Sequence, residues 1–265
     1  MKVYGIQFDS EWENKNKNYE LVSTLLQDIE IEKNSLLILP EMFATGFSLN
    51  IEVTAKNEPK KTETYLSKLA RDKHSWVVAG MVYPSENENK GINCSVIFSP
   101  CGKKISANSK ILPIPMLGEN KVHLSGSKIE CHTIESFNVT ALICYDLRFP
   151  EFFRTALSSG TDVFVVIACW PEVRKNHWIQ LIQARAIENQ AYVIGVNRVG
   201  ADKGLKYCGH SLVVDPVGNI LANGGSDEMV VEAEIDKTII GSWRNEFPVI
   251  ECINNHPFTN SQSIE

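Results

Sequence analysis

The feature that most constrains the fold is an alternation of short apolar runs with amphipathic stretches along the whole chain. The run 36–39 (Leu-Leu-Ile-Leu) is apolar throughout, which is typical of a strand covered on both faces. Strands are predicted for residues 3–8, 36–39, 76–83, 139–144, 162–167, 192–197 and 230–235.

Helical periodicity fills the spaces between these runs. It predicts helices over residues 18–30, 61–73, 150–159 and 176–188, with a short helix around Lys237. Two hairpins are predicted, 94–98 with 104–107 and 211–215 with 218–221. Because strands alternate with helices, the sequence predicts an α/β fold with antiparallel pieces added by the hairpins.

Composition limits the class of protein. Of the 265 residues, 43% are hydrophobic and 22% charged, an ordinary globular balance. With no linker or repeat evident, we predict a single domain over residues 1–265, with a C-terminal tail from about residue 250. No apolar stretch reaches the roughly 18 residues of a membrane span, and the first residues do not resemble a signal peptide. We therefore expect a cytoplasmic protein without a membrane partner.

Charge and cysteine usage exclude further classes. The net charge of -6 does not favour a general affinity for nucleic acid. The seven cysteines include no C-x-x-C pair, so a zinc site or disulfide framework has little support. We predict no metal and no cofactor.

Two reactive side chains stand where predicted strands end. Glu41 comes just after the run 36–39, and Cys144 closes the run 139–144. Sites of α/β proteins gather at strand carboxyl ends, and a strand-to-helix turn exposes a nucleophile there. The start of a helix also lowers the pKa of a thiol. On position alone, a surface carboxylate at Glu41 and a buried structural thiol at Cys144 stay open as alternatives.

Other candidates carry less information by themselves. Lys110 follows a predicted hairpin strand, where a lysine is ordinarily an exposed charge, and Glu119 has no distinctive position. Six histidines leave a cysteine–histidine pair possible. His210 has the most distinctive neighbourhood among them, but we interpret it as a structural residue.

Taken together, ordered segments of the chain resemble the nitrilase superfamily. Leu39-Pro40-Glu41-Met42-Phe43 resembles its glutamate motif, Ser109-Lys110-Ile111 its lysine motif, and Ile143-Cys144-Tyr145-Asp146 its cysteine motif. The similarity continues through Ala168-Cys169-Trp170-Pro171 and Gly195-Val196-Asn197-Arg198, and ends at Asp215-Pro216-Val217-Gly218. It leaves only the part of the chain after about Val249 unmatched.

Within the superfamily, the chain is most similar to the omega-amidase branch. Trp170-Pro171-Glu172-Val173-Arg174 resembles the bacterial members, and Glu119 stands where an additional active-site glutamate is found. One departure concerns the segment after Lys110. The usual Lys-x-His-Leu-Phe pattern is replaced by Lys110-Ile111-Leu112-Pro113-Ile114-Pro115, which bears on substrate preference.

The resemblance implies a four-layer α-β-β-α sandwich that associates as a homodimer through the helices after Cys144 and near Asn176. It also implies an enzyme that hydrolyses the omega-amide of a dicarboxylic 2-oxo acid, such as 2-oxoglutaramate, with water as co-substrate. In that reaction Glu41 is the base, Cys144 the nucleophile, and Lys110 with the backbone N–H of Tyr145 holds the oxyanion. Glu119 positions Lys110 or the substrate amide.

We expect Phe43, Tyr145 and Trp170 to wall the pocket and Arg174 to meet the substrate carboxylate, although core packing or a surface ion pair would also suit these residues. The Asp146/Arg148 pair is expected to brace the turn at the nucleophile. Three rival functions remain: another amidase or nitrilase activity, such as N-carbamoyl or aliphatic amide hydrolysis; a non-catalytic binding protein; and a thiol-redox role with Cys169 as a spatial neighbour.

Overall fold

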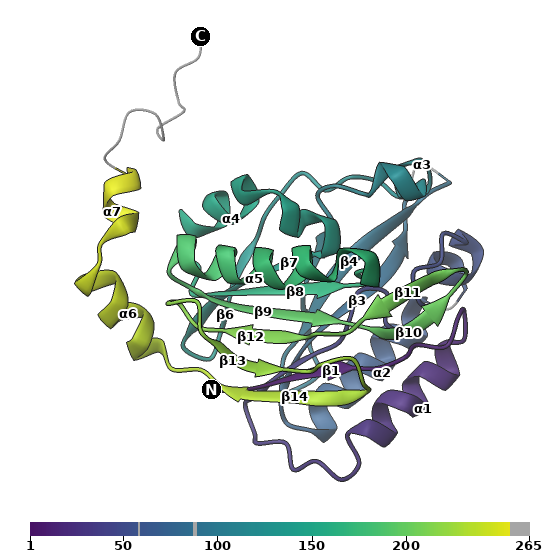
Figure 1. The fold of residues 1–265 in the computed structure, drawn as a ribbon. Coiled ribbons are helices and arrows are strands. Elements are labelled where there is room, and N and C mark those ends of the chain that lie inside the picture. The colour runs from purple at the N-terminus through teal and green to yellow at the C-terminus, as the bar shows by residue number, and fades with distance from the viewer. Residues whose placement is uncertain (58, 87–88, 255–265) are drawn as a thin grey trace.

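Two six-stranded sheets form the centre of the computed structural model, which describes residues 1–57, 59–86 and 89–254 (Figure 1). The first sheet contains, in order, β14 (Met229–Glu234), β1 (Lys2–Gln7), β2 (Leu36–Ile38), β3 (Trp76–Pro84), β4 (Gly91–Phe98) and β5 (Lys104–Ser109). The second contains β13 (Ile220–Asn223), β12 (Leu212–Val214), β9 (Tyr192–Asn197), β8 (Val163–Ala168), β7 (Phe137–Ile143) and β6 (Cys131–Ile134).

Helices cover the outer face of each sheet. α1 (Lys15–Leu25) and α2 (Pro59–Asp72) lie on the first sheet, and α4 (Pro150–Leu157) and α5 (Lys175–Asn189) lie on the second (Figure 1). The result is the four-layer α-β-β-α sandwich that the sequence resemblance predicted.

The continuous apolar runs follow from this layering, because both faces of the central strands are buried. In β2, Leu36 and Ile38 point toward the second sheet, where they pack in the core between the layers. Leu37 and the following Leu39 point the other way and pack with Tyr19 of α1 and Leu66 of α2. Successive side chains of β2 therefore point to opposite faces of the sheet, as in any strand, but the side chains on both faces are apolar.

The strand order brings the ends of three parallel strands together. β1, β2 and β3 are parallel neighbours in the first sheet, and β7, β8 and β9 are parallel neighbours in the second. Glu41 lies beyond the end of β2, Cys144 directly after β7 and Cys169 directly after β8. Because the two sheets pack face to face, the residues that follow these strand ends can lie in one site between the layers.

Most predicted elements are confirmed within a few residues, and the differences have local causes. The helix predicted over 18–30 ends earlier, at Leu25, and the short helix around Lys237 is α6 (Lys237–Glu246). The edge strand β6 and the hairpin of β10 (Val199–Asp202) and β11 (Leu205–Cys208) were not predicted from the sequence. Polar residues and glycines in these segments obscure the alternation of apolar and polar residues that indicates a strand.

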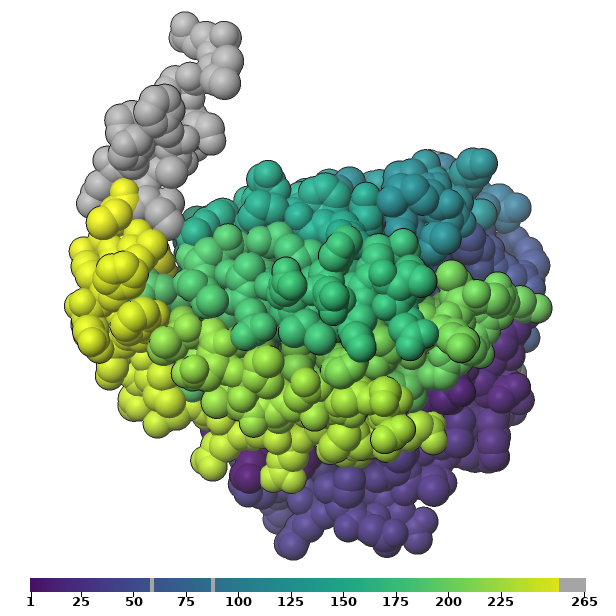
Figure 2. Space-filling model, in the orientation of Figure 1, coloured from purple at the N-terminus to yellow at the C-terminus, as the bar shows by residue number. Residues whose placement is uncertain are grey.

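The C-terminal region extends along one end of the sandwich. α6 and the following α7 (Val249–Asn254) lie at the left in Figure 1 and form the yellow region of Figure 2. The predicted tail from about residue 250 thus begins inside α7, and residues 255–265 lie outside the described residues. Among the helices of the described ranges, none has the length and apolar character needed to span a membrane.

Candidate active site

Glu41 occupies a tight turn between the two sheets. Its side chain is fully buried, and the next residue, Met42, has a positive φ of 47°. Gly80 of β3 packs directly against this turn: a Cβ built on Gly80 would lie 2.5 Å from the Glu41 Cα and 2.5 Å from the Met42 nitrogen. Only glycine leaves room there, because the atoms it faces belong to the backbone.

Lys110 reaches the same place from β5. Residues 106, 108 and 110 share one phase of the strand, and this phase faces the second sheet. The Lys110 Nζ lies 2.8 Å from Glu41 Oε1 and 2.8 Å from Glu119 Oε2, and all three side chains are completely buried. Burial lowers the pKa of Lys110, but the charges of Glu41 and Glu119 outweigh burial and hold that pKa well above its ordinary value.

Glu119, at the start of α3 (Glu119–Val122), accepts four hydrogen bonds. Its Oε2 accepts from Lys110 and from the Ile114 N–H at 2.7 Å, and its Oε1 accepts from Asn93 Nδ2 at 3.0 Å and His123 Nδ1 at 3.3 Å. Burial raises the pKa of Glu119, but Lys110 and these hydrogen bonds outweigh it and lower the pKa to about 2. With its roughly four acceptor positions filled, Glu119 is a fixed anion.

Glu41 has spare acceptor capacity, in contrast. Its Oε1 accepts from Lys110 and from Asn93 Nδ2, each at 2.8 Å, and its Oε2 accepts from the Cys169 N–H at 2.9 Å. One acceptor position on Oε2 is left. Glu41 therefore accepts fewer hydrogen bonds from nitrogen donors than Glu119 does, and it is the carboxylate to which the Cys144 thiol hydrogen-bonds.

Cys144 begins the turn η3 (Cys144–Arg148) with a positive φ of 48°. Asp146 holds this turn: its carboxylate accepts from the Ile143 N–H at 3.2 Å and from the Leu112 N–H, in the loop after Lys110, at 3.0 Å. Burial, followed by the charge of Glu41, raises the pKa of the Cys144 thiol well above its ordinary value. The lowered thiol pKa expected from the helix start is therefore wrong, since burial outweighs the N-terminal effect.

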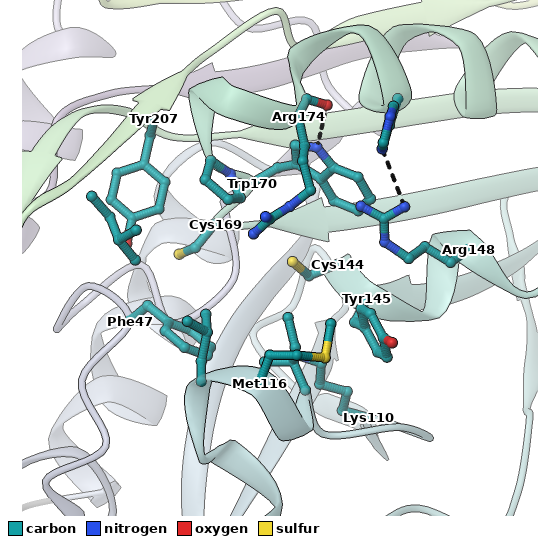
Figure 3. Close-up of a pocket in the computed structure, with 15 residues that line it drawn as sticks. Phe47, Lys110, Met116, Cys144, Tyr145, Arg148, Cys169, Trp170, Arg174 and Tyr207 are labelled. Carbon is teal, nitrogen blue, oxygen red and sulfur yellow. Dashed lines mark hydrogen bonds between the residues drawn. The ribbon is translucent and has the colours of Figure 1, made fainter.

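A cavity of about 370 Å³ opens over Cys144 (Figure 3). In the close-up, the sulfur atoms of Cys144 and Cys169 both face this space. Most of its wall is apolar or aromatic. The wall consists of residues from the loops and turns that follow the strands and from β11 of the β10–β11 hairpin: Phe47, Ile114, Met116, Leu117, Tyr145, Trp170, Pro171, Leu205 and Tyr207. Cys144 thus lies at the base of a pocket large enough for a small organic molecule.

Two guanidinium groups line the same cavity. Arg148 lies over the Trp170 ring, 4.6 Å from its centroid, and donates a 3.4 Å hydrogen bond to His177 Nδ1. Burial and the positive charge of Arg174 lower the pKa of Arg148. Neither arginine has a carboxylate partner among the described residues, so the pocket has positive charge available for an anionic ligand.

The structure corrects two predicted placements. Phe43 does not line the cavity; its ring packs in the core between Tyr19 and Tyr65, with centroids 6.1 and 6.2 Å away, and Phe47 lines the cavity instead. The tight turn after Glu41 directs Phe43 toward the helices. Nor does Arg148 brace the nucleophile turn together with Asp146, because its guanidinium is directed toward His177 and the cavity.

The remaining predicted residues come together as expected in space. Glu41, Lys110, Cys144 and Glu119 form one cluster, and Tyr145, Trp170 and Arg174 line the cavity above it. No histidine of the described ranges hydrogen-bonds to Cys144; His210 lies elsewhere, with its carbonyl accepting from Trp178 Nε1. The described residues also contain no group of acidic, histidine or cysteine side chains arranged to hold a metal ion.

Sequence reasoning missed Asn93 and His123. Asn93 lies inside β4, and both of its amide N–H groups contact the Glu41 and Glu119 carboxylates. The available signal was an asparagine in a mostly apolar strand, where a buried amide needs a partner. His123 follows Glu119 by four residues, a spacing that places two side chains on one face of a helical turn.

Comparison with known proteins identifies the family. The carbon-nitrogen hydrolase family matches residues 3–245. The 2-oxoglutaramate amidase of Bacillus subtilis (strain 168) is 32% identical over 94% of this chain and 95% of its own length. The omega-amidase YafV of Yersinia enterocolitica is 30% identical over 94% of each chain.

A solved structure of the nitrilase superfamily is also similar to this chain. The crystal structure of Saccharomyces cerevisiae Nit3, a member of branch 10 of the nitrilase superfamily, matches with a TM-score of 0.85 and 26% identity, covering 94% of each chain. The four-layer architecture agrees with this structural match. The chain therefore belongs to the carbon-nitrogen hydrolase family and is a hydrolase of the nitrilase superfamily.

Proposed function

We propose that this enzyme hydrolyses the terminal amide of a small dicarboxylic 2-oxo acid, such as 2-oxoglutaramate, to the acid and ammonia. The observation that carries the proposal is the pair Arg148 and Arg174, which line the cavity over Cys144 without a carboxylate partner among the described residues. A guanidinium binds a carboxylate through paired hydrogen bonds. Relatives named as 2-oxoglutaramate amidase and omega-amidase support the same substrate class.

The size and walls of the cavity favour a compact substrate. A volume of about 370 Å³ lies near the lower end of the range for small-molecule sites, roughly 300–1,000 Å³. Aromatic walls at Phe47, Trp170 and Tyr207 suit a short carbon chain, while the arginines bind its free carboxylate. The amide end would then lie toward Cys144.

In the acylation step, Glu41 takes the thiol proton of Cys144 as the sulfur attacks the amide carbon. The raised thiol pKa supports a neutral thiol at rest, which makes a base necessary. Lys110 and the backbone N–H of Tyr145 stabilise the oxyanion. The C–N bond then breaks, and the proton on Glu41 goes to the leaving nitrogen, so that ammonia and a thioester result.

In the second step, Glu41 removes a proton from water as the water oxygen attacks the thioester carbon. The C–S bond breaks, the acid is released, and the proton returns from Glu41 to the Cys144 sulfur. Glu119 takes no part in proton transfer in this scheme, because its acceptor positions are filled. It fixes Lys110, whose charge must face the oxyanion.

The first experiment measures ammonia release from 2-oxoglutaramate and 2-oxosuccinamate, with glutamine, an N-carbamoyl amino acid, an aliphatic amide and a nitrile alongside. Turnover of the oxo-acid amides by the wild type, absent in Cys144→Ala, is the expected result. If only the N-carbamoyl amino acid is hydrolysed, with release of carbon dioxide and ammonia, the substrate class is N-carbamoyl compounds and not oxo-acid amides. No ammonia release from any of these compounds would favour a non-catalytic binding role.

Two arginine variants test the carboxylate contact separately. We expect Arg174→Gln and Arg148→Gln to lower kcat/KM for 2-oxoglutaramate by about 10- to 100-fold, because a charge-assisted contact is lost. Turnover of an uncharged aliphatic amide, where detectable, is the matched control and should change little. Equal losses on both substrates would contradict carboxylate binding by these arginines.

We also propose that the enzyme is a cytoplasmic homodimer, with one hydrolase domain per chain. A reducing cytoplasm keeps the Cys144 thiol free. α4 and α5 present partly exposed apolar side chains on the outer face of the second sheet, among them Phe152, Leu157 and the 53% exposed Ile187. Phe153, on the inner side of α4, packs internally against Phe164 and is not available for this contact.

A further inference from the structure

A row of buried polar side chains interrupts the apolar interior between the two sheets. It consists of Asn93 and Ser95 on β4 and Ser106 and Asn108 on β5; we refer to these four residues as the polar row. Ser95 and Asn108 are direct partners across the two strands. Ile97, two residues beyond Ser95 in the same strand phase, packs in the apolar core between the sheets, so the polar row faces that interior.

Every member of the polar row has a buried polar atom without a hydrogen-bond partner among the described residues. These atoms are Asn93 Oδ1, Ser95 Oγ, Ser106 Oγ, and both Oδ1 and Nδ2 of Asn108. Isolated unpaired groups of this kind are uncommon, because each costs free energy on burial. Several of them on one face of two neighbouring strands indicate a bound polar ligand that satisfies them together.

The polar row connects two places that the catalytic scheme does not link. At one end, Asn93 donates to Glu41 Oε1 and Glu119 Oε1. On the β5 side of the row, Asn108 lines a second, polar cavity of about 140 Å³, together with Ser109, Ser127 and Lys128. Asn108 is only 7% exposed, so its amide belongs to the interior while its strand borders this cavity.

We propose that the polar row binds a chain of ordered water molecules, and that one of them donates a hydrogen bond to Asn93 Oδ1 and positions Asn93 for catalysis. Water is the ligand that fits, because the row offers hydroxyl and amide groups without a buried net charge. The second cavity at the edge of β5 admits water from the surface. This inference rests on the proposed function only for its kinetic consequence.

The spacing suits a bridging water. Residues two apart in a strand lie about 6.5 Å apart, and their side chains share one face. A single water with two hydrogen bonds of about 2.8 Å spans most of that distance. Such a water between Asn93 and Ser95 donates to the Asn93 carbonyl oxygen and exchanges its other hydrogen bond with the Ser95 hydroxyl.

The orientation of the Asn93 amide matters for the reaction. Its two N–H groups contact Glu41 and Glu119, and a rotated amide would turn its oxygen toward both carboxylates. A donor on the Oδ1 side stabilises the productive orientation, while the loss of that donor leaves a buried acceptor unpaired. The water thus acts through Asn93, and Ser95 is a positioning residue rather than a catalytic one.

Two substitutions of Ser95 distinguish the effect of losing the serine hydroxyl from the effect of losing the bound water. Ser95→Ala removes the hydroxyl and leaves space, so the water can remain on Asn93. Ser95→Val fills the space and displaces it. We expect Ser95→Val to lower kcat about tenfold or more relative to Ser95→Ala, with KM little changed, because a buried acceptor next to the base is left unpaired.

Thermal unfolding of both variants and a crystal structure of the wild type complete the test. The expected structure shows an ordered water within hydrogen-bonding distance of Asn93 Oδ1 and Ser95 Oγ. Its absence would overturn the proposal, as would equal kcat values for two variants of similar Tm. If Ser95→Val does not fold, or if the enzyme proves inactive on oxo-acid amides, the wild-type structure still decides whether the water is bound.

Discussion

At the scale of single residues, one lysine serves two carboxylates that are chemically different. Lys110 contacts Glu41 and Glu119 at the same 2.8 Å, yet Glu119 accepts hydrogen bonds from three further groups and Glu41 keeps one acceptor position. In the proposed mechanism, these different environments separate Glu41, which exchanges a proton, from Glu119, which stays ionised near neutral pH. Paired glutamates in a buried site are not interchangeable.

Glu119→Gln tests this separation. The substitution keeps the size of the side chain but removes the charge that fixes Lys110, so we expect kcat to fall by about 100- to 1,000-fold as oxyanion stabilisation is lost. Glu41→Gln should remove turnover altogether, because no base remains. Intact-mass measurement of the acyl-enzyme distinguishes the two, since Glu119→Gln should still accumulate some thioester. Full activity of Glu119→Gln would contradict its assigned role.

The same residue predicts acid sensitivity. The pKa of Glu119 is lowered in the folded protein from 4.5 to about 2, so its ionised form stabilises the fold above pH 4.5, and this contribution is lost as the pH falls toward about 2. At about 1.4 kcal/mol per pKa unit, the contribution is about 3 kcal/mol. Urea unfolding between pH 2 and 5 should therefore show a steeper loss of stability in wild type than in Glu119→Gln; parallel curves would refute this.

The sequence predicted which polar side chains cluster at the base of the cavity better than it predicted the cavity wall. The positions of Glu41 and Cys144 after apolar strands singled these two residues out, and the resemblance to the nitrilase superfamily added Lys110 and Glu119. Among the predicted wall residues, Phe43 was misplaced, because the turn with a positive φ at Met42 directs Phe43 away from the cavity, which Phe47 lines instead. Backbone turns of that kind leave no periodic signal.

At the scale of elements, strand phase decides which side chains enter the site. Lys110 continues the inward phase of β5, and Asn93 has the inward phase of β4. Central strands were predicted accurately because burial on both faces makes them continuously apolar. The β10–β11 hairpin was missed, although Leu205 and Tyr207 line the cavity, because its stability depends on contacts such as Arg198 over the Tyr207 ring.

Close contact between β3 and the Glu41 turn predicts a specific sensitivity to added volume. Gly80→Ala would place a methyl group against backbone atoms of Glu41 and Met42, which have little freedom to move. We expect a loss of about 1–3 kcal/mol in the free energy of unfolding, together with a marked fall in kcat. Chemical denaturation and steady-state kinetics measure the two effects.

Gly241 of α6 provides a matched control. A Cβ at this position meets no atom within 4 Å, so Gly241→Ala adds a methyl group in open space within a helix. The substitution should raise stability by about 0.5–1 kcal/mol and leave kcat unchanged. Similar behaviour of the two alanine variants would show that the Gly80 contact is unimportant.

At the scale of the whole molecule, the active site is divided between the two sheets. The first sheet supplies Glu41, Lys110 and Asn93, and the second supplies Cys144 and Cys169. The four-layer arrangement could be predicted from the order of motifs along nearly the whole chain. The contacts across the interface could not, because they depend on how the sheets stack and not on the order of their strands.

The proposed association through α4 and α5 also concerns the whole molecule. Ile187→Asp would place a charge on the apolar outer face of these helices, and we expect it to shift a homodimer to monomer in light scattering coupled to size-exclusion chromatography. Ile105→Asp, at an exposed position on β5, is the control and should remain dimeric. A wild type that elutes as a monomer would contradict the proposed dimer.

Because the site is divided between two sheets, catalytic activity also reports whether folding is complete. A folding intermediate in which only β1 to β5 have assembled would carry Lys110 beside its two glutamates but not the Cys144 thiol, whereas the second sheet alone would present that thiol without its base. Neither intermediate would consume substrate. During refolding, we therefore expect catalytic activity to lag behind the return of circular dichroism and to report the final docking of one sheet on the other.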